Sequence, residues 1–184
     1  VFDLEIKNVI DGKLITWDDH DAMGISVGCA FDYRDMCFRV FMDDNIDELV
    51  TRLNEPDTLI VAFNHVHFDN NLLRACANVK LKPDSELRNY DMYLESKKAV
   101  NAGKFSKGFK LDDHLKAMNL KMKTANGAMA PIWYQEKKYG KVVDYCLNDV
   151  MVEKTLFEVI YSTGKMANAN SPEFYQIEVP NIGV

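Results

Sequence analysis

The chain alternates between short apolar stretches and polar links, and each stretch has the period of a strand or of a helix. Residues 1–6, VFDLEI, alternate apolar and acidic positions, which predicts a strand with one apolar face. GISVGCAF at 24–31 and MCFRVFM at 36–42 indicate two further strands, and their short connection predicts antiparallel neighbours. The acidic sequence TWDDHD, after the turn at Asp11-Gly12, is expected to be a loop.

The middle of the chain changes from strands alone to strands and helices. Residues 44–54 carry apolar side chains at helical spacing, and TLIVAF at 58–63 is a continuous apolar run typical of a strand buried on both faces. FDNNLLRACA predicts a helix with Asp69 or Asn70 near its N-terminus. Another strand is expected over residues 89–94.

The last part of the chain is expected to be mostly helical. A loop bearing lysine and glycine is predicted over residues 97–110, and helices near 111–119, 131–138 and 141–160. STGKMANANSP is expected to be a loop and FYQIEVP a closing strand. Three antiparallel strands followed by alternating strands and helices predict a mixed α/β fold, and the length suits one domain, residues 1–184.

Composition limits the class of protein. The apolar fraction of 47% and the charged fraction of 27% are those of an ordinary globular domain. No apolar run approaches the roughly 18 residues needed to span a bilayer, and no signal peptide is visible, so we expect no membrane partner. The chain begins at Val1 in an apolar stretch, which suggests that residues precede it. The scattered cysteines predict a reduced, cytoplasmic setting without structural zinc: Cys29, Cys37, Cys76 and Cys146.

Charge is distributed unevenly around the formal net charge of −6. Residues 1–72 hold 15 acidic against 5 basic side chains, whereas residues 97–141 hold 11 lysines against 3 acidic side chains. This asymmetry predicts an acidic site beside a basic surface, and the alternative is a lysine-rich surface that is simply solvated. The negative net charge argues against indiscriminate coating of nucleic acid.

Three short motifs carry candidate chemistry. Asp3 and Glu5 are two apart on a predicted strand, so their side chains leave the same face. Adjacent carboxylates repel by about 4 kcal/mol at close range in a protein, so they require a counter-cation, and Mg²⁺ prefers such oxygen ligands. The alternative is an edge strand with one wet face.

The second motif lies in AFNHVHFDNNLL. Asn64 and Asp69 bracket the end of the buried strand and the start of the next helix, where ligands gather in open α/β sheets. The alternative is that Asp69 only caps its helix. His65 and His67 have no third metal ligand nearby in the sequence, so we interpret them as polar residues of the loop.

The third motif is YCLNDV, in which Tyr145 and Asp149 are four apart in a predicted helix and therefore stack one turn above the other. An ionisable side chain on an apolar helical face is costly unless it is paired or binds a metal. A tyrosine packed in the core, with its hydroxyl bonded to an acceptor, is the alternative.

In this order, the three motifs resemble those of the DEDD 3′→5′ exonucleases, which belong to the DnaQ-like superfamily with an RNase H-like fold. Asp3 and Glu5 match D-x-E, NHVHFD matches N-x(2–3)-[FY]-D, and YCLND matches Y-x(3)-D. The tyrosine is typical of the DEDDy branch, since the other branch has a histidine where Asp144 stands. The residues in FDLEI and YCLND are most similar to those of proofreading domains of family B DNA polymerases and of small bacterial or viral exonucleases. The resemblance covers residues 1–160.

This resemblance implies a single RNase H-like exonuclease domain that hydrolyses phosphodiester bonds from the 3′ end of mostly single-stranded nucleic acid, releasing nucleoside 5′-monophosphates. Two Mg²⁺ or Mn²⁺ ions would be held by the four carboxylates of Asp3, Glu5, Asp69 and Asp149. Tyr145 would orient the attacking water, because a tyrosine of ordinary pKa near 10 is a poor base.

Substrate contacts are expected from the same motifs and from the lysine-rich region. By resemblance Leu4 contacts the terminal nucleotide, and Asn64 belongs to the second motif. Phe68 stacks on a base or else packs in the core. The lysines expected to hold the approaching strand are Lys104, Lys107, Lys110, Lys121 and Lys123.

Two other readings stay open. One is an RNase H-like endonuclease, and the other is a catalytically weak or inactive module that binds nucleic acid or a protein partner, for example one of replication or repair. The choice between DNA and RNA is also open, because it depends on contacts with the 2′-hydroxyl.

Overall fold

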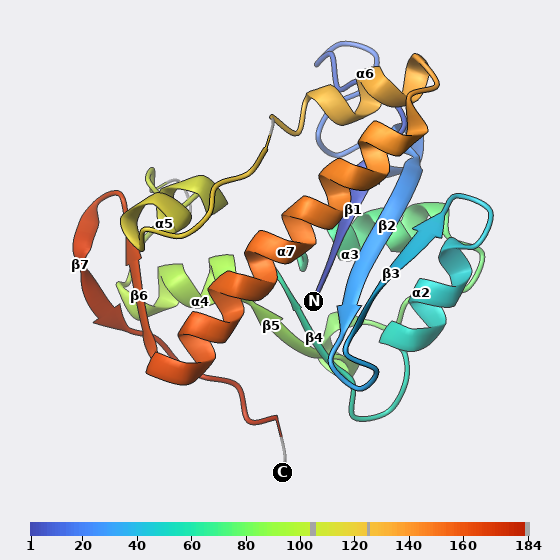
Figure 1. Cartoon of the computed structure of the whole chain (residues 1–184). Coiled ribbons are helices and arrows are strands. Elements are labelled where there is room, and N and C mark those ends of the chain that lie inside the picture. The colour runs from blue at the N-terminus through green and yellow to red at the C-terminus, as the bar shows by residue number, and fades with distance from the viewer. Residues whose placement is uncertain (104–105, 125, 183–184) are drawn as a thin grey trace.

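The computed structural model describes residues 1–103, 106–124 and 126–182 (Figure 1). An antiparallel sheet begins the fold, in the order β1-β2-β3: β1 Phe2–Ile6, β2 Ile25–Asp32 and β3 Cys37–Met42. These are the three strands predicted from the alternating pattern. Asp3 lies opposite Cys29 and Glu5 opposite Val27, so the register places both acids on the face of the sheet that carries these two residues.

The connection from β1 to β2 contains a short helix, α1 His20–Met23, where a loop was expected. Met23 is fully buried, and its backbone N–H donates to the carbonyl of Asp19. Burial of one methionine therefore folds the end of an otherwise polar stretch, and no local pattern in TWDDHD marks it.

The middle of the chain supplies α2 Ile46–Leu53, β4 Leu59–Ala62, α3 Asp69–Cys76 and the 3-10 turn η1 Asp84–Glu86, followed by β5 Arg88–Asp91. Strands β4 and β5 pair in parallel, and β4 contacts β1. The strand expected over 89–94 ends at Asp91, because the Asp91 side chain caps the next helix, α4 Met92–Ala99. The prediction of strand to Leu94 and of loop from Lys97 is therefore wrong.

The C-terminal part contains α5 Leu111–Ala117, α6 Met129–Gln135 and the 25-residue α7 Tyr139–Thr163. Helix α7 ends at Gly164, which has a φ of 63°. A hairpin follows, β6 Lys165–Asn168 and β7 Ser171–Gln176. The loop predicted for STGKMANANSP is wrong in its middle, because Met166 and Ala167 are fully buried there and extend as β6. The predicted closing strand begins earlier and ends at Gln176.

Helices cover both faces of the antiparallel sheet. Helices α2 and α3 contact one face, where Leu4 packs with Ile46 and Leu49, and a Cβ on Gly28 would come within 2.9–3.0 Å of these three side chains. Helix α7 crosses the other face in front of β1 and β2 (Figure 1). The acidic face of β1 is therefore the one that meets α7. Among the described residues, no helix combines the length and apolar character needed to cross a membrane.

Candidate metal and phosphodiester site

Strand β1 sends its side chains alternately into two environments. Phe2 and Leu4 are buried in the core with α2 and α3, while Asp3 and Glu5 face α7. One carboxylate oxygen of each acid and the sulfur of Cys146 on α7 all lie within 4.8 Å of one another. The predicted pairing of Asp3 and Glu5 on one face is confirmed, and the face is not wet, because Glu5 is buried.

Helix α7 presents Tyr145 and Asp149 one turn apart on its buried side. Oδ2 of Asp149 accepts a hydrogen bond from Nζ of Lys123 at 2.5 Å, whereas Oδ1 and the Tyr145 hydroxyl have no hydrogen-bond partner among the described residues. A Cβ on Gly127 would lie 3.6 Å from that hydroxyl, so the connection between α5 and α6 passes over the tyrosine. The tyrosine is packed in the core, as that alternative expects, but its hydroxyl has no acceptor at hydrogen-bond distance among the described residues, and the nearby charge of Asp149 acts on it.

Asp69 is the first residue of α3, directly after the turn that follows β4. It is buried, its Oδ1 has no hydrogen-bond partner among the described residues, and α3 has no side-chain cap. The alternative reading of Asp69 as a helix cap is therefore wrong. Its carboxylate instead interacts with the charge of Asp3 on β1.

Burial and mutual repulsion dominate the electrostatics of the four carboxylates. Burial, followed by the charge of Asp149, raises the pKa of Asp3 to about 7. Burial and then Asp3 raise the pKa values of Glu5 and Asp69 well above their usual range, and burial also raises the pKa of Asp149 although Lys123 lowers it in part. Three separate segments have thus brought acids close enough to oppose one another's ionisation.

Lys123 brings a positive charge into this cluster. Burial lowers the pKa of its ammonium, but the charges of Asp3 and Asp149 outweigh burial and raise the pKa above its ordinary value. Lys123 was expected to hold the approaching strand, and the structure places it among the carboxylates instead. The sequence marks it only as one of many lysines, because nothing in its neighbours predicts a contact with Asp149.

Glu153 is a further acid that the motifs did not include. It lies one turn after Asp149 on α7, is only 2% exposed, and its Oε2 has no hydrogen-bond partner among the described residues. Burial and then the charge of Asp3 raise its pKa. The sequence held one signal for Glu153, its position four residues after Asp149. This spacing puts Tyr145, Asp149 and Glu153 on the same side of a helix.

These residues suit a hard divalent cation. The unpartnered oxygens of Asp69 and Asp149 are buried, and buried carboxylate oxygens without partners are stabilised by metal coordination. The Cys146 thiol is a poor competing ligand, because burial raises its pKa and its Sγ donates to the backbone oxygen of Asp3 at 3.4 Å. The remaining donors are carboxylate oxygens, the type of ligand that suits Mg²⁺ and Mn²⁺.

The predicted substrate residues of the first two motifs have different environments. The Leu4 side chain is buried in the core, so only its backbone faces the site. Asn64 has a φ of 65°, and its backbone N–H donates to Asp91. Phe68 is half-buried against the core, and its ring lies 6.0 Å from the rings of Trp17 and His20.

The predicted substrate lysines lie elsewhere. Lys110 precedes α5, where its backbone N–H donates to Asp113, and the Lys107 carbonyl accepts from Asn170 in the turn of the β6–β7 hairpin. Both are exposed, and none of the contacts described for them reaches the four carboxylates. Lys104 lies outside the described residues. Their role in holding a strand stays a prediction.

A cavity of about 670 Å³ lies at another place, between the start of β1, the start of β4 and the end of α7. Its lining is mainly apolar and includes Val1, Phe31, Leu59, Phe157 and Tyr161. None of the site carboxylates lines it, so this cavity is separate from the acidic cluster.

Comparison with known proteins gives a structural likeness and no family assignment. No family model matches the sequence, and no curated protein matches it. Among solved structures, the fold is similar to the family B DNA polymerase from the hyperthermophilic archaeon Pyrobaculum calidifontis, with a TM-score of 0.59 and 18% sequence identity. The match covers 86% of this chain and 24% of the polymerase chain, so the chain spans about a quarter of that protein's length.

At this identity the likeness concerns the fold alone. The chain has the mixed α/β arrangement predicted from its sequence, a three-stranded antiparallel sheet followed by alternating strands and helices, and this arrangement is consistent with an RNase H-like fold.

Proposed function

We propose that this chain is a metal-dependent 3′→5′ exonuclease of the DEDDy type, which hydrolyses phosphodiester bonds at the 3′ end of single-stranded DNA or RNA. One observation carries the proposal. Four acids from β1, α3 and α7 converge, and two of them, Asp69 and Asp149, keep buried oxygens that have no hydrogen-bond partner in the part of the chain that the structure describes. A structural protein gains nothing from such a cluster, because each unpaired buried acid destabilises the fold.

Asp3, Glu5, Asp69 and Asp149 would hold two Mg²⁺ or Mn²⁺ ions. When bound, such ions neutralise the phosphate and activate water for in-line attack. The chain's contribution is to fix these four carboxylates on rigid elements, with Asp3 and Glu5 on a paired strand and Asp149 on a long helix. We also expect a protein partner, such as one of replication or repair.

Tyr145 would orient the attacking water. Burial and the charge of Asp149 raise the pKa of its hydroxyl, so the phenol stays protonated at neutral pH and can donate or accept a hydrogen bond. It does not act as a base, because the tyrosinate is not populated. The free hydroxyl supports this role, since it has no partner among the described residues.

Lys123 would provide a positive charge beside the reacting phosphate. Its ammonium neutralises Asp149 while no metal is bound, and it lies close enough to face the negative charge of a phosphate held over the same carboxylates. The Lys123 ammonium would thus act together with the two metal ions in neutralising the reacting phosphate.

The same ion pair favours a second candidate, a catalytically inactive module. Lys123 occupies one oxygen of Asp149, which is where a metal ligand is needed, and a lysine in that place can substitute for the cation permanently. In that case the chain would bind nucleic acid or a protein partner without cleaving it.

The test is incubation of the protein with 5′-labelled single-stranded DNA, and with the matching RNA, in Mg²⁺, Mn²⁺ or EDTA. Asp149→Asn is the inactive variant, and Asp144→Asn on the same helix is its control, because Asp144 is exposed and lies outside the motifs. A metal-dependent ladder that shortens from the 3′ end, lost only in Asp149→Asn, is the expected result. Intact strands in every lane would favour the inactive module, and one internal cut would favour the endonuclease.

A further inference from the structure

Asp91, at the end of β5, has a buried carboxylate that accepts four backbone hydrogen bonds. Its Oδ1 accepts from the N–H groups of Asn64 at 2.8 Å, Tyr93 at 3.0 Å and Leu94 at 3.3 Å, and its Oδ2 accepts from Val66 at 3.1 Å. Two of these bonds cap α4, and the other two reach the turn that follows β4. One side chain therefore joins a helix start to a distant turn.

The two bonds from Asn64 and Val66 to Asp91 are not needed to cap α4. A serine at this position caps a helix almost as well as an aspartate, and it is too short to reach a neighbouring segment. Asn64 meanwhile has a φ of 65°, in the left-handed region that few residues other than glycine and asparagine adopt. The two bonds to Asn64 and Val66 stabilise this turn.

The turn leads directly to a site carboxylate. The Phe68 N–H donates to the Asn64 carbonyl at 3.2 Å, and the Asn70 N–H donates to the His65 carbonyl at 2.8 Å. These two backbone hydrogen bonds connect the turn that Asp91 holds to the start of α3. Asp69 lies between the two donors, so its position follows from that of the turn.

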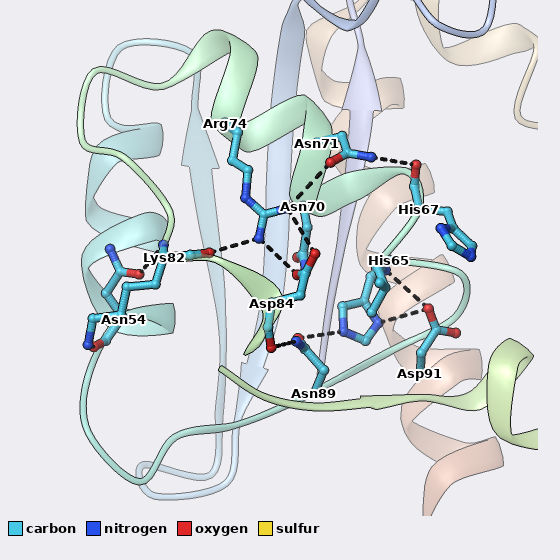
Figure 2. Close-up of polar contacts among 11 residues, drawn as sticks. Asn54, His65, His67, Asn70, Asn71, Arg74, Lys82, Asp84, Asn89 and Asp91 are labelled. Atoms are coloured by element: carbon cyan, nitrogen blue, oxygen red, sulfur yellow. Dashed lines mark hydrogen bonds and ion pairs between the residues drawn. The ribbon is translucent and has the colours of Figure 1, made fainter. Parts of the chain in front are cut away.

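His65 holds the same turn from a second side. It is fully buried, its Nε2 is 3.1 Å from Oδ1 of Asn89, and its Nδ1 is 3.6 Å from Oδ2 of Asp91 (Figure 2). Its ring also meets the edge of Phe2, with 5.9 Å between the ring centroids. Because Phe2 precedes Asp3 on β1, the turn is held against the strand that carries the first two acids.

We propose that Asp91 is a positioning residue of the carboxylate site, which fixes Asp69 relative to Asp3 through the Asn64–Val66 turn without touching the metal or the substrate. The inference rests on the proposed function in one respect, that the four acids form a metal site. Groups hydrogen-bonded directly to metal ligands typically contribute about 10–100-fold in metal affinity or activity, and Asp91, which acts one step further away through the turn, belongs at the lower end of that range. The alternative is that Asp91 only caps α4.

The variant Asp91→Ser separates these roles, because it retains a cap for α4 and loses both bonds to the turn. Asp47→Ser is the matched control. Asp47 likewise accepts from two distant backbone N–H groups, those of Asn78 at 2.8 Å and Val79 at 3.1 Å, but these residues follow the C-terminal end of α3, away from Asp69 at its start, and none of them is a site residue. Mn²⁺ binding is measured by calorimetry without nucleic acid, well below the melting temperature of each variant, and kcat and KM are measured on a single strand.

We expect Asp91→Ser to bind Mn²⁺ about tenfold more weakly or worse and to lose kcat with little change in KM, while Asp47→Ser matches the wild type in both. Wild-type Mn²⁺ affinity and kcat in Asp91→Ser would overturn the positioning role and leave the exonuclease intact. If Asp91→Ser does not fold, Asp91→Asn answers the same question, because it keeps one acceptor oxygen but turns an amide toward the Val66 N–H.

The two proposals fail in different ways. A wild-type protein that binds Mn²⁺ and cleaves no strand would overturn the exonuclease, and the affinity ratio between wild type and Asp91→Ser would still decide the role of Asp91. A wild-type protein that binds no Mn²⁺ would overturn both.

Discussion

The ammonium nitrogen of Lys123 lies 2.5 Å from Oδ2 of Asp149, inside the cluster of acids that would bind metal. The lysine side chain is 23% exposed and the aspartate side chain 2%, so the lysine enters the site from its open side. A charge-assisted bond of this kind stabilises the metal-free protein, because it offsets part of the repulsion among the carboxylates. It also means that an incoming ion must compete with a cation already present.

Replacing Lys123 should separate these two effects. We expect Lys123→Met to bind Mn²⁺ several-fold more tightly, because the competing charge is gone, and to lower kcat by about tenfold or more, because the phosphate loses a cationic neighbour. Lys116→Met, exposed on α5 and not among the lysines expected to hold a strand, should change neither value. Calorimetry gives the affinity and single-strand degradation gives kcat, and equal values in the two variants would contradict the role assigned to Lys123.

The stability of the metal-free protein should fall as the pH rises through neutrality. Asp3 has a pKa of about 7 in the folded state against an ordinary value of 3.8, so between these values the folded state retains a proton that the unfolded state has released. The free energy of unfolding therefore decreases with rising pH and levels off above pH 7. Glu5 and Asp69, whose pKa values are also raised, extend the loss to higher pH.

The measurement is urea unfolding in EDTA between pH 6.5 and 8. The effect of Asp3 is taken as the difference between wild type and Asp3→Asn, so that other groups that titrate in this range cancel. We expect Asp3→Asn to gain stability relative to wild type as the pH rises, and added Mg²⁺ to remove that difference in trend. If the difference in free energy of unfolding between the two proteins does not depend on pH, the pKa of Asp3 is not raised.

Tyr145→Phe should lower kcat by about 100-fold while leaving the fold and the affinity for Mn²⁺ unchanged, because the hydroxyl has no hydrogen-bond partner among the described residues and its loss leaves no buried group unpaired. Tyr134→Phe is the matched control, since it removes the hydroxyl of an α6 tyrosine that lies 3.5 Å from Asp43. Product formation under single-turnover conditions checks the rate. A variant that loses Mn²⁺ affinity as well would indicate that the tyrosine organises the carboxylates rather than the water.

Packing between β2 and α2 predicts a destabilising change at a glycine. Gly28→Ala should lower the free energy of unfolding by about 1–3 kcal/mol, because its Cβ would come within 3.0 Å of Leu4, Ile46 and Leu49. Gly140→Ala should instead raise stability by up to about 1 kcal/mol, since its Cβ meets no atom within 4 Å and the residue lies in α7. Urea midpoints of the two variants compare them directly, and equal shifts would contradict the close packing of α2.

Sequence patterns predicted the elements whose signals are local. β1 and α7 were predicted because alternation and helical spacing are properties of neighbouring residues, and the same spacing paired Asp3 with Glu5 and Tyr145 with Asp149. Contacts between distant segments could not be predicted in this way. The Lys123–Asp149 pair joins residues 26 apart, and the strand predicted beyond Asp91 is a helix because a side chain caps it. β6 could not be predicted for the same reason, because its polar sequence becomes a strand only through the burial of Met166 against distant parts of the chain.

Trp17 should report directly on nucleic-acid binding. It is 68% exposed, in the connection between β1 and α1, and its ring meets the edge of Phe68 at 6.0 Å, next to the catalytic candidate Asp69. A nucleobase that stacks at Phe68 would therefore contact Trp17. Stacking on an aromatic side chain is worth about 1–3 kcal/mol per base, so Trp17→Ala should weaken single-strand binding by about 5–100-fold, and Trp17→Phe should recover part of the affinity.

The experiment uses Trp133→Phe as the background, which leaves Trp17 as the one tryptophan of the chain. Titration with an oligothymidylate in Ca²⁺ is expected to quench its emission, and a duplex of the same length should quench it less, since paired bases cannot stack on an outside ring. Exposed acids flank Trp17 in TWDDHD, so a strand that stacks there must direct its phosphates away from this loop, toward the basic surface. Unchanged emission at saturating strand concentration would place the substrate path on another side of Phe68, and the lysines at the start of α5 would then be the next positions to test.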